Sequence, residues 1–118
     1  MTDRIELRGL RATGIHGVLP EEQTRAQPFE IDLDISLDLR AAGASDALDD
    51  TVDYGSLGER AAAVVTGERF ALLERLAARI AEVVLADGRV RAVAVTVRKL
   101  RPPVPVDLAT AAVRIERP

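Results

Sequence analysis

Four side chains capable of proton transfer or ligand binding each lie beside a pattern that predicts a defined structural element: Lys99, Tyr54, Glu22 and Glu74. Lys99 continues the spacing of Val93, Val95 and Val97, so it is expected at the end of the apolar face of a strand. An ammonium group there loses hydration, which lowers a lysine pKa toward the range of a general base. A lysine extending from a strand end into solvent is the commoner explanation, so the spacing alone leaves both open.

The other candidates also have ordinary structural explanations. Glu22 lies in a predicted loop and could polarise a water or a hydroxyl, although solvated acidic loops are common. The phenol of Tyr54, at the start of a predicted helix, could exchange a proton or simply cover the edge of the core. Glu74 falls in the first turn of a second helix, where a carboxylate is favourable without any ligand. His16, the only histidine, lies in a glycine-flanked loop and is expected to be structural or a hydrogen-bonding group of the loop.

The elements that must position these residues follow from two hydrophobic periods. Alternation of apolar and polar residues predicts strands, and an apolar stripe at helical spacing predicts helices. A loop is expected at 13–27, and the connector at 41–53 is long enough for a helical turn. The predicted strands and helices, in chain order, cover residues 4–12 (strand), 27–40 (strand), 54–67 (helix), 72–88 (helix), 93–99 (strand) and 113–116 (strand).

The strand expected at 27–40 carries the longest alternation, from Phe29 to Leu39, with apolar residues on one side and mostly acidic residues on the other. The order β-β-α-α-β-β predicts an α+β fold, with an antiparallel four-stranded sheet and both helices on one face. The acidic face must then meet water, or arginines on a neighbouring strand such as Arg4 and Arg8. A small sheet with such long strands has open edges, so several copies are expected to assemble.

The composition limits the classes of function. The 118 residues are 47% apolar and 30% charged, which suits one globular domain over residues 1–118. A net charge of −3 and 3% aromatic residues argue against a nucleic-acid partner. The absence of cysteine and the single histidine argue against disulfides, a thiol nucleophile and a zinc site. No apolar run is long enough to span a bilayer, so we expect a cytoplasmic protein with no bound metal and no membrane partner.

Five segments, taken in order, resemble the dihydroneopterin aldolase family: IELRGL at 5–10, GIHGV at 14–18, DTVDYG at 50–55, LLERLA at 72–77, and VRK at 97–99 followed by PPVP at 102–105. The resemblance covers essentially the whole chain. It implies the tunnelling fold, in which four subunits close their sheets into a barrel and two such rings stack into an octamer. It also implies active sites between neighbouring subunits, with no cofactor.

The resemblance assigns the binding residues for a small pterin substrate. Glu74 matches the carboxylate that accepts two adjacent N–H groups of the pterin ring, a geometry suited to a carboxylate. Backbone groups near Val52 and Leu73 complete the hydrogen bonds of the ring. Tyr54 and Glu22 also contact the substrate.

The implied reaction is a retro-aldol cleavage of 7,8-dihydroneopterin, which gives 6-hydroxymethyl-7,8-dihydropterin and glycolaldehyde for tetrahydrofolate biosynthesis. Lys99 matches the catalytic lysine, assisted by Glu22 and an ordered water, and Tyr54 of the adjacent subunit handles a hydroxyl proton. The ring imine of the substrate accepts the electrons, so the lysine acts in acid–base catalysis without a Schiff base. Some epimerisation to 7,8-dihydromonapterin is also expected.

Two departures and two alternatives remain. Asp53 stands where some relatives carry histidine, and residues 106–108 stand where a glycine or small residue is expected near the turn. One alternative is an epimerase of the same fold acting on dihydroneopterin triphosphate, which needs basic residues for the phosphates, for example Arg75 and Arg101. The other is a non-catalytic pterin-binding subunit, against which the joint presence of the four candidate side chains argues.

Overall fold

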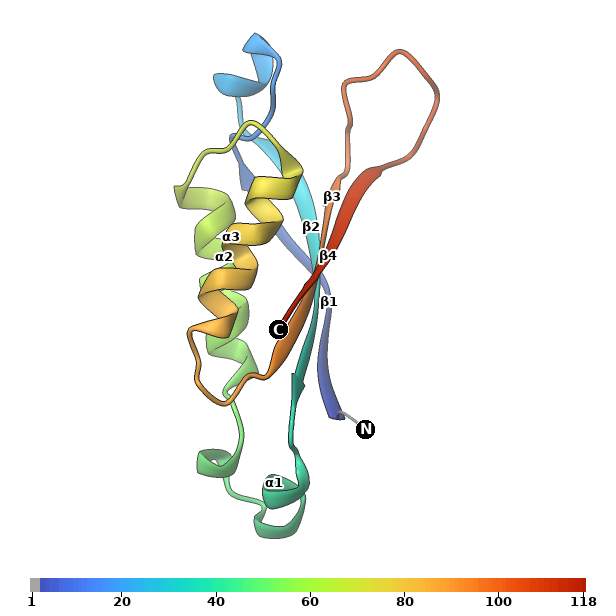
Figure 1. Ribbon diagram of the computed structural model, residues 1–118. Helices are drawn as coiled ribbons and strands as arrows, with labels where there is room; N and C mark the ends of the chain where they lie inside the picture. The colour runs from blue at the N-terminus through green and yellow to red at the C-terminus, as the bar shows by residue number, and fades with distance from the viewer. Residues whose placement is uncertain (1–2) are drawn as a thin grey trace.

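Alternating sequence builds one antiparallel sheet of four strands, in the order β1-β2-β3-β4. The computed structural model describes residues 3–118 (Figure 1). The strands are β1 (Asp3–Gly14), β2 (Gln27–Leu37), β3 (Ala92–Lys99) and β4 (Ala111–Arg117). The two outer strands, β1 and β4, each pair with one neighbour within the chain, so each presents one open edge.

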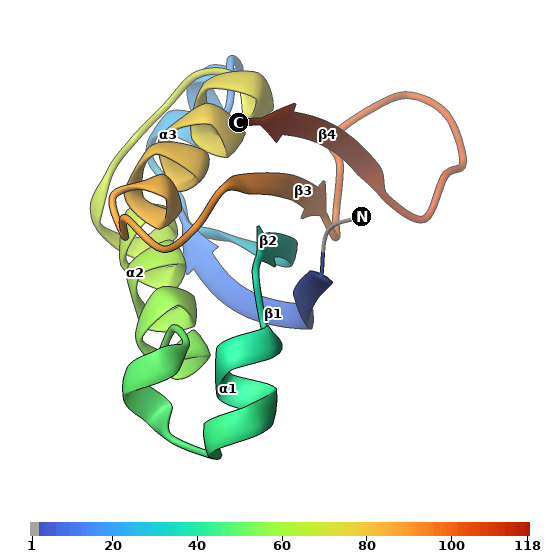
Figure 2. The ribbon, with the colours of Figure 1, turned by 60° about the horizontal axis from the view of Figure 1, so that its bottom comes forward.

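Two long helices cover one face of this sheet and leave the other face without helices (Figures 1 and 2). This arrangement confirms the predicted α+β class and the predicted order of elements. The long helices are α2 (Tyr54–Gly67) and α3 (Leu73–Leu85), and the short ones are η1 (Pro20–Gln23), α1 (Arg40–Ser45) and η2 (Leu48–Asp50). Within residues 3–118, no helix has the length and apolar character needed to cross a membrane.

The core lies between the apolar side of the sheet and the apolar stripes of α2 and α3. Phe29, Ile31 and Leu33 of β2 are completely buried, as the period-two pattern predicts. Leu76 and Ile80 of α3 are buried against them in the same core. Each such side chain contributes about 1.5–3 kcal/mol through removal from water, so this core fixes the elements that carry the candidate residues.

The opposite face of β2 is built from ion pairs rather than from solvated carboxylates. Asp34 is only 5% exposed, and its two carboxylate oxygens contact Arg8 of β1 at 2.5 Å and Arg114 of β4 at 3.3 Å. Burial raises the pKa of Asp34, but the hydrogen bonds and charges of the two arginines outweigh it and hold that pKa below its usual range. The predicted partner Arg8 is therefore confirmed, whereas Arg4 forms no ion pair within residues 3–118.

Several strand boundaries differ from the predicted ones. β1 continues to Gly14, so residues 13–14 belong to the strand and not to the loop, and a bulge at Gly9, with φ of 71°, shifts its register. β2 ends at Leu37 instead of residue 40, because the chain turns there into α1. Apolar and polar residues therefore continue to alternate after Leu37, although the chain no longer forms a strand there.

The ends of the helical stripes also differ from the prediction. Tyr54 and Leu72 are 59% and 50% exposed, although both fit the apolar spacing. Each lies at the first residue of its helix or just before it, where the helix extends past the core. α3 ends at Leu85, earlier than the predicted end at residue 88.

Candidate active site

Lys99 and Glu22 form a buried ion pair at one end of the sheet. Lys99 is the last residue of β3, Glu22 lies in η1, and the lysine Nζ is 2.7 Å from the glutamate Oε2. The two side chains are 14% and 7% exposed. The structure therefore excludes the solvated-loop interpretation of Glu22 and the solvent-directed interpretation of Lys99.

The geometry of the first loop holds Glu22 in this position. Its Oε2 accepts a 2.9 Å hydrogen bond from Nε2 of Gln27, and its Oε1 accepts a 3.4 Å hydrogen bond from the backbone N–H of Leu19. Gly17, with φ of 153°, leaves room for the carboxyl group, because a Cβ at that position would overlap it. Burial raises the pKa of Glu22, but hydrogen bonds from Gln27 and Lys99 outweigh it and lower that pKa. Glu22 is therefore held as a carboxylate in its ion pair with Lys99.

Sequence reasoning misses Gln27. A glutamine at the start of a strand has no pattern that marks it as functional, and only the fold brings its amide against Glu22.

Glu74 and Leu73 lie at the same end of the molecule, at the start of α3. Leu73 is half-buried, whereas Glu74 is exposed in the first turn of the helix. Within residues 3–118 the Glu74 carboxylate has no ion-pair partner and no side-chain hydrogen bond. It is therefore available to a ligand that offers N–H donors, as the resemblance implies.

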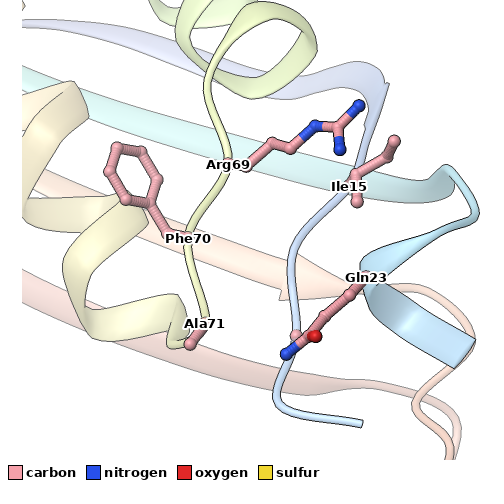
Figure 3. A pocket seen from close by; sticks show the side chains of 6 residues that line it. Ile15, Gln23, Arg69, Phe70 and Ala71 are labelled. Atoms are coloured by element: carbon pink, nitrogen blue, oxygen red, sulfur yellow. The ribbon is translucent and has the colours of Figure 1, made fainter. Parts of the chain in front are cut away.

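A hollow of about 290 Å³ lies between the first loop and the segment that leads into α3 (Figure 3). Ile15, Gly17 and Gln23 line one side, and Arg69, Phe70 and Ala71 line the other. Gln23 directly follows Glu22, and Ala71 lies three residues before Glu74. The hollow thus lies between the two segments that carry these residues, but none of Glu22, Lys99 and Glu74 lines it.

The remaining predicted site residues lie at the other end of the helical layer. α2 begins at Tyr54 and runs antiparallel to α3, so Tyr54 and Glu74 are at opposite ends (Figure 1). Val52 is buried just before α2, and Asp53 caps this helix by accepting a 3.3 Å hydrogen bond from the backbone N–H of Ser56. One chain therefore brings Glu22 and Lys99 into contact, places Leu73 and Glu74 at the same end of the molecule, and places Val52 and Tyr54 at the other end (Figure 1).

Solved structures share this fold over nearly the whole chain. Dihydroneopterin aldolase from E. coli in complex with neopterin matches with a TM-score of 0.90 and 33% identity, covering 98% of this chain and 99% of that one. A Burkholderia dihydroneopterin aldolase bound to guanine matches with a TM-score of 0.81 and 27% identity, covering 98% of this chain and 90% of that one. The fold that this chain shares with these structures is the tunnelling fold.

The sequence comparisons are more specific. The family model described as dihydroneopterin aldolase matches residues 5–116. The dihydroneopterin aldolase of Streptomyces coelicolor is 45% identical over 115 residues, covering 98% of this chain and 97% of that protein. The chain belongs to the dihydroneopterin aldolase family. It is an enzyme, a lyase that performs the retro-aldol cleavage of dihydroneopterin in folate biosynthesis.

Proposed function

We propose that the Glu22–Lys99 pair is the acid–base centre of the cleavage and that Glu74 anchors the pterin ring. The observation that carries this proposal is the buried 2.7 Å contact between Lys99 Nζ and Glu22 Oε2, at the end of the molecule where α3 begins with the exposed Glu74 (Figure 1). A carboxylate accepts two parallel N–H donors of a planar ring, which fixes the ring in one orientation. The side chain of the substrate then reaches toward Lys99.

The cleavage needs one proton to leave a side-chain hydroxyl and one to arrive at carbon. When the hydroxyl at C2′ of 7,8-dihydroneopterin loses its proton, the C1′–C2′ bond breaks and C2′ leaves as the aldehyde carbon of glycolaldehyde. The bonding electrons enter the C6=N5 imine of the ring, and C1′ is then protonated to give 6-hydroxymethyl-7,8-dihydropterin. Lys99, held by Glu22, exchanges these protons together with Tyr54 and water.

Replacement of Lys99 tests this assignment. Lys99→Met removes the ammonium and keeps much of the side-chain volume, so glycolaldehyde release should fall by about 10²- to 10⁴-fold. Binding of neopterin, which reports on Glu74, should change little. Glu21→Gln is the matched control, since Glu21 is the exposed neighbour of Glu22 and has no ion-pair partner within residues 3–118. Unchanged turnover of the Lys99 variant would remove Lys99 from the mechanism.

We also infer that each active site is shared by two copies of the chain, within a tetrameric ring that pairs into an octamer. The separation of Tyr54 from Lys99 supports this, because one copy supplies the two at opposite ends. An apolar hollow of about 460 Å³ beside Tyr54, lined by Leu7, Leu10 and Gly58, offers a surface for a neighbouring copy. The open edges of β1 and β4 supply the strands that close a barrel.

The reverse of the cleavage step, an aldol addition, accounts for the expected epimerisation. Glycolaldehyde that is retained after cleavage can turn and present the other face of its carbonyl to C1′ of the enamine, so that C2′ is re-formed with the opposite configuration, which gives 7,8-dihydromonapterin. Incubation with 7,8-dihydroneopterin and chromatography of the products measures both activities at once.

One observation favours the triphosphate epimerase as a second candidate. Arg25 and Arg101 line a hollow of about 340 Å³ on the side of Glu22, where phosphates on the substrate side chain could reach, although Glu21 also lines it. Arg75, the other predicted phosphate ligand, is instead 3.3 Å from Glu82 and stacks on Phe70. Comparison of turnover with free and triphosphorylated dihydroneopterin separates the two functions. A cytoplasmic location stays a prediction.

A further inference from the structure

His16 is a buried histidine that the proposed reaction does not use, yet both of its ring nitrogens are engaged. The side chain is 1% exposed. Its Nδ1 accepts a 3.1 Å hydrogen bond from the backbone N–H of Phe70, and its Nε2–H donates a 2.8 Å hydrogen bond to the carbonyl of Val65. An N–H group can only donate, so the ring is neutral and carries its proton on Nε2.

The contacts of His16 reach the segment that carries Glu74. Phe70 lies four residues before Glu74, in the short connection between α2 and α3. The backbone N–H of Gly17 donates a 3.0 Å hydrogen bond to the carbonyl of Phe70, and the rings of His16 and Phe70 stack with centroids 5.9 Å apart. The ring nitrogen, the stacking and the adjacent backbone thus all hold Phe70 against the first loop.

The backbone of His16 also reaches the acid–base pair. The Nε2 group of Gln27 donates to the His16 carbonyl at 2.9 Å and to Glu22 Oε2 at 2.9 Å. That same Oε2 accepts from Lys99. An unbroken series of hydrogen bonds therefore runs from Phe70 through His16 and Gln27 to Glu22 and Lys99.

Two glycines leave room for this series. A Cβ at Gly14 would overlap the Val65 carbonyl and lie 2.8 Å from the His16 Nε2, and a Cβ at Gly17 would overlap the Glu22 carboxyl group. Each of three residues in the segment Gly14-Ile15-His16-Gly17 therefore has its own part. Gly14 allows a close approach to α2, His16 binds the connection to α3, and Gly17 leaves space for Glu22.

We propose that His16 is a positioning residue that fixes the start of α3, with Glu74, relative to the Glu22–Lys99 pair. The inference rests on the proposed function, in which Glu74 holds the ring and Lys99 acts on its side chain. A shift of about 1 Å between two such groups lowers turnover by about 100-fold while binding persists. The Phe70–Nδ1 hydrogen bond is the hydrogen bond of the His16 side chain that links the first loop to the connection before α3.

Two substitutions of His16 that change the packing by nearly the same amount differ in whether the hydrogen bond from Phe70 can form. Both His16→Asn and His16→Gln remove the ring. The amide oxygen of asparagine can take the place of Nδ1 and accept from Phe70, whereas the amide N–H of glutamine can take the place of Nε2–H and donate to Val65. For His16→Asn we expect a kcat within about threefold of the wild type, and for His16→Gln a kcat about 10- to 100-fold lower. Neopterin affinity should change little in both.

A second substitution, at another residue of the series, keeps the proposal testable if the His16 variants fail to fold. Gln27→Met cuts the series on its other side, between His16 and Glu22, and should lower kcat about tenfold with neopterin affinity kept. Thr66→Val is the control, since it removes a hydrogen bond to Ala62 at the end of α2 without touching the series. It should keep wild-type turnover.

The readouts separate positioning from a purely structural role. Melting temperature, oligomeric state, kcat and neopterin affinity are measured for each variant. The proposal is overturned if kcat of the His16 variants follows their melting temperatures and not the Phe70 contact, if kcat and affinity fall together, or if Gln27→Met keeps full turnover. Wild-type enzyme and Lys99→Met serve as the test of the proposed function itself. If the wild type releases glycolaldehyde and Lys99→Met does not, failure of the His16 prediction concerns His16 alone.

Discussion

At the scale of single residues, Glu22 differs most from its sequence context. The loop around it looks hydrophilic, but the side chain is 7% exposed, because Gly17 makes room for it and both Gln27 and Lys99 donate hydrogen bonds to it. Burying a carboxylate is unfavourable unless it is paired, so this local arrangement has to be supplied by residues far apart in the chain. Buried, paired ionisable groups of this kind are common at functional sites.

Glu74 is expected to contribute binding rather than chemistry. Glu74→Gln keeps the size of the side chain but can accept only one of two N–H donors, so neopterin affinity should fall about 10- to 100-fold. Isothermal titration with neopterin measures this change. Glu82→Gln, on the same helix and paired with Arg75 and Arg79, is the control and should bind normally. Equal affinity of the Glu74 variant and the wild type would place the ring elsewhere.

His16 makes folding stability depend on pH. Burial lowers the pKa of His16, and the nearby charge of Lys99 lowers it further, whereas Glu68 acts in the opposite direction. The unfolded chain therefore binds a proton below a pH of about 6.5 that the folded chain resists. The contribution of His16 to stability is complete above that pH and is lost as the pH falls below it, at no more than about 1.4 kcal/mol per pH unit.

Urea denaturation at matched subunit concentration checks this at pH 7.5 and pH 5.5. The wild type should lose more stability between the two values than His16→Asn does. Carboxylates such as Glu22 have lowered pKa values and begin to matter only at lower pH. A wild type and a variant that lose the same stability would show that His16 titrates normally.

At the scale of elements, the strands stop where their pairing stops and not where the alternation stops. Periodicity predicts their interiors correctly, but β1 gains two residues and β2 loses three at its end relative to the pattern. Alternation cannot report where a strand loses its partner, because Asp38 and Leu39 still alternate after the pairing has ended.

Asp53 has a role that belongs to α2. Its Oδ1 caps the helix that begins with Tyr54. Asp53→Ala should reduce the free energy of unfolding by about 1 kcal/mol, whereas Asp53→Asn should keep most of it, because asparagine is also a good cap. Thermal denaturation measures both. A stable alanine variant would mean that Ser56 finds another acceptor.

At the scale of the whole molecule, the proposed site residues lie at two ends of one chain, as the shared-site proposal requires. Exposed apolar side chains gather near both halves: Val18, Leu19, Leu72, Val104, Val106 and Leu108 near the Lys99 end, and Leu48 and Tyr54 at the other. Exposed apolar surface of this kind is typical of interfaces between proteins. The chain is therefore expected to be an oligomer by light scattering, and a monomer at micromolar concentration would contradict the shared site.

Mixing two inactive variants tests the shared site directly. Lys99→Met and Tyr54→Phe should each release little glycolaldehyde alone. In a ring refolded from an equal mixture, a site has an intact Lys99 in half of the cases and an intact Tyr54 in half, so about a quarter of the sites recover. No recovery in a mixture that forms mixed rings would show that both residues serve the same copy.

The sequence by itself determined the order of elements, the apolar face of each, and the family. Hydrophobic periods report which side of an element is buried, and short motifs such as DTVDYG and LLERLA persist in order along the chain. It also predicted that His16 is structural or a hydrogen-bonding group of the loop, and the two hydrogen bonds of its ring agree with the second of these.

Only the tertiary structure decided that Glu22 is buried, that Gln27 holds it, and that Tyr54 lies at the far end of the helices from Glu74. The physical reason is that these relations are contacts between segments 5 to 77 residues apart, created when the sheet and the helices pack. A local pattern records how one element faces the core. It does not record which side chains of other elements will meet at its end.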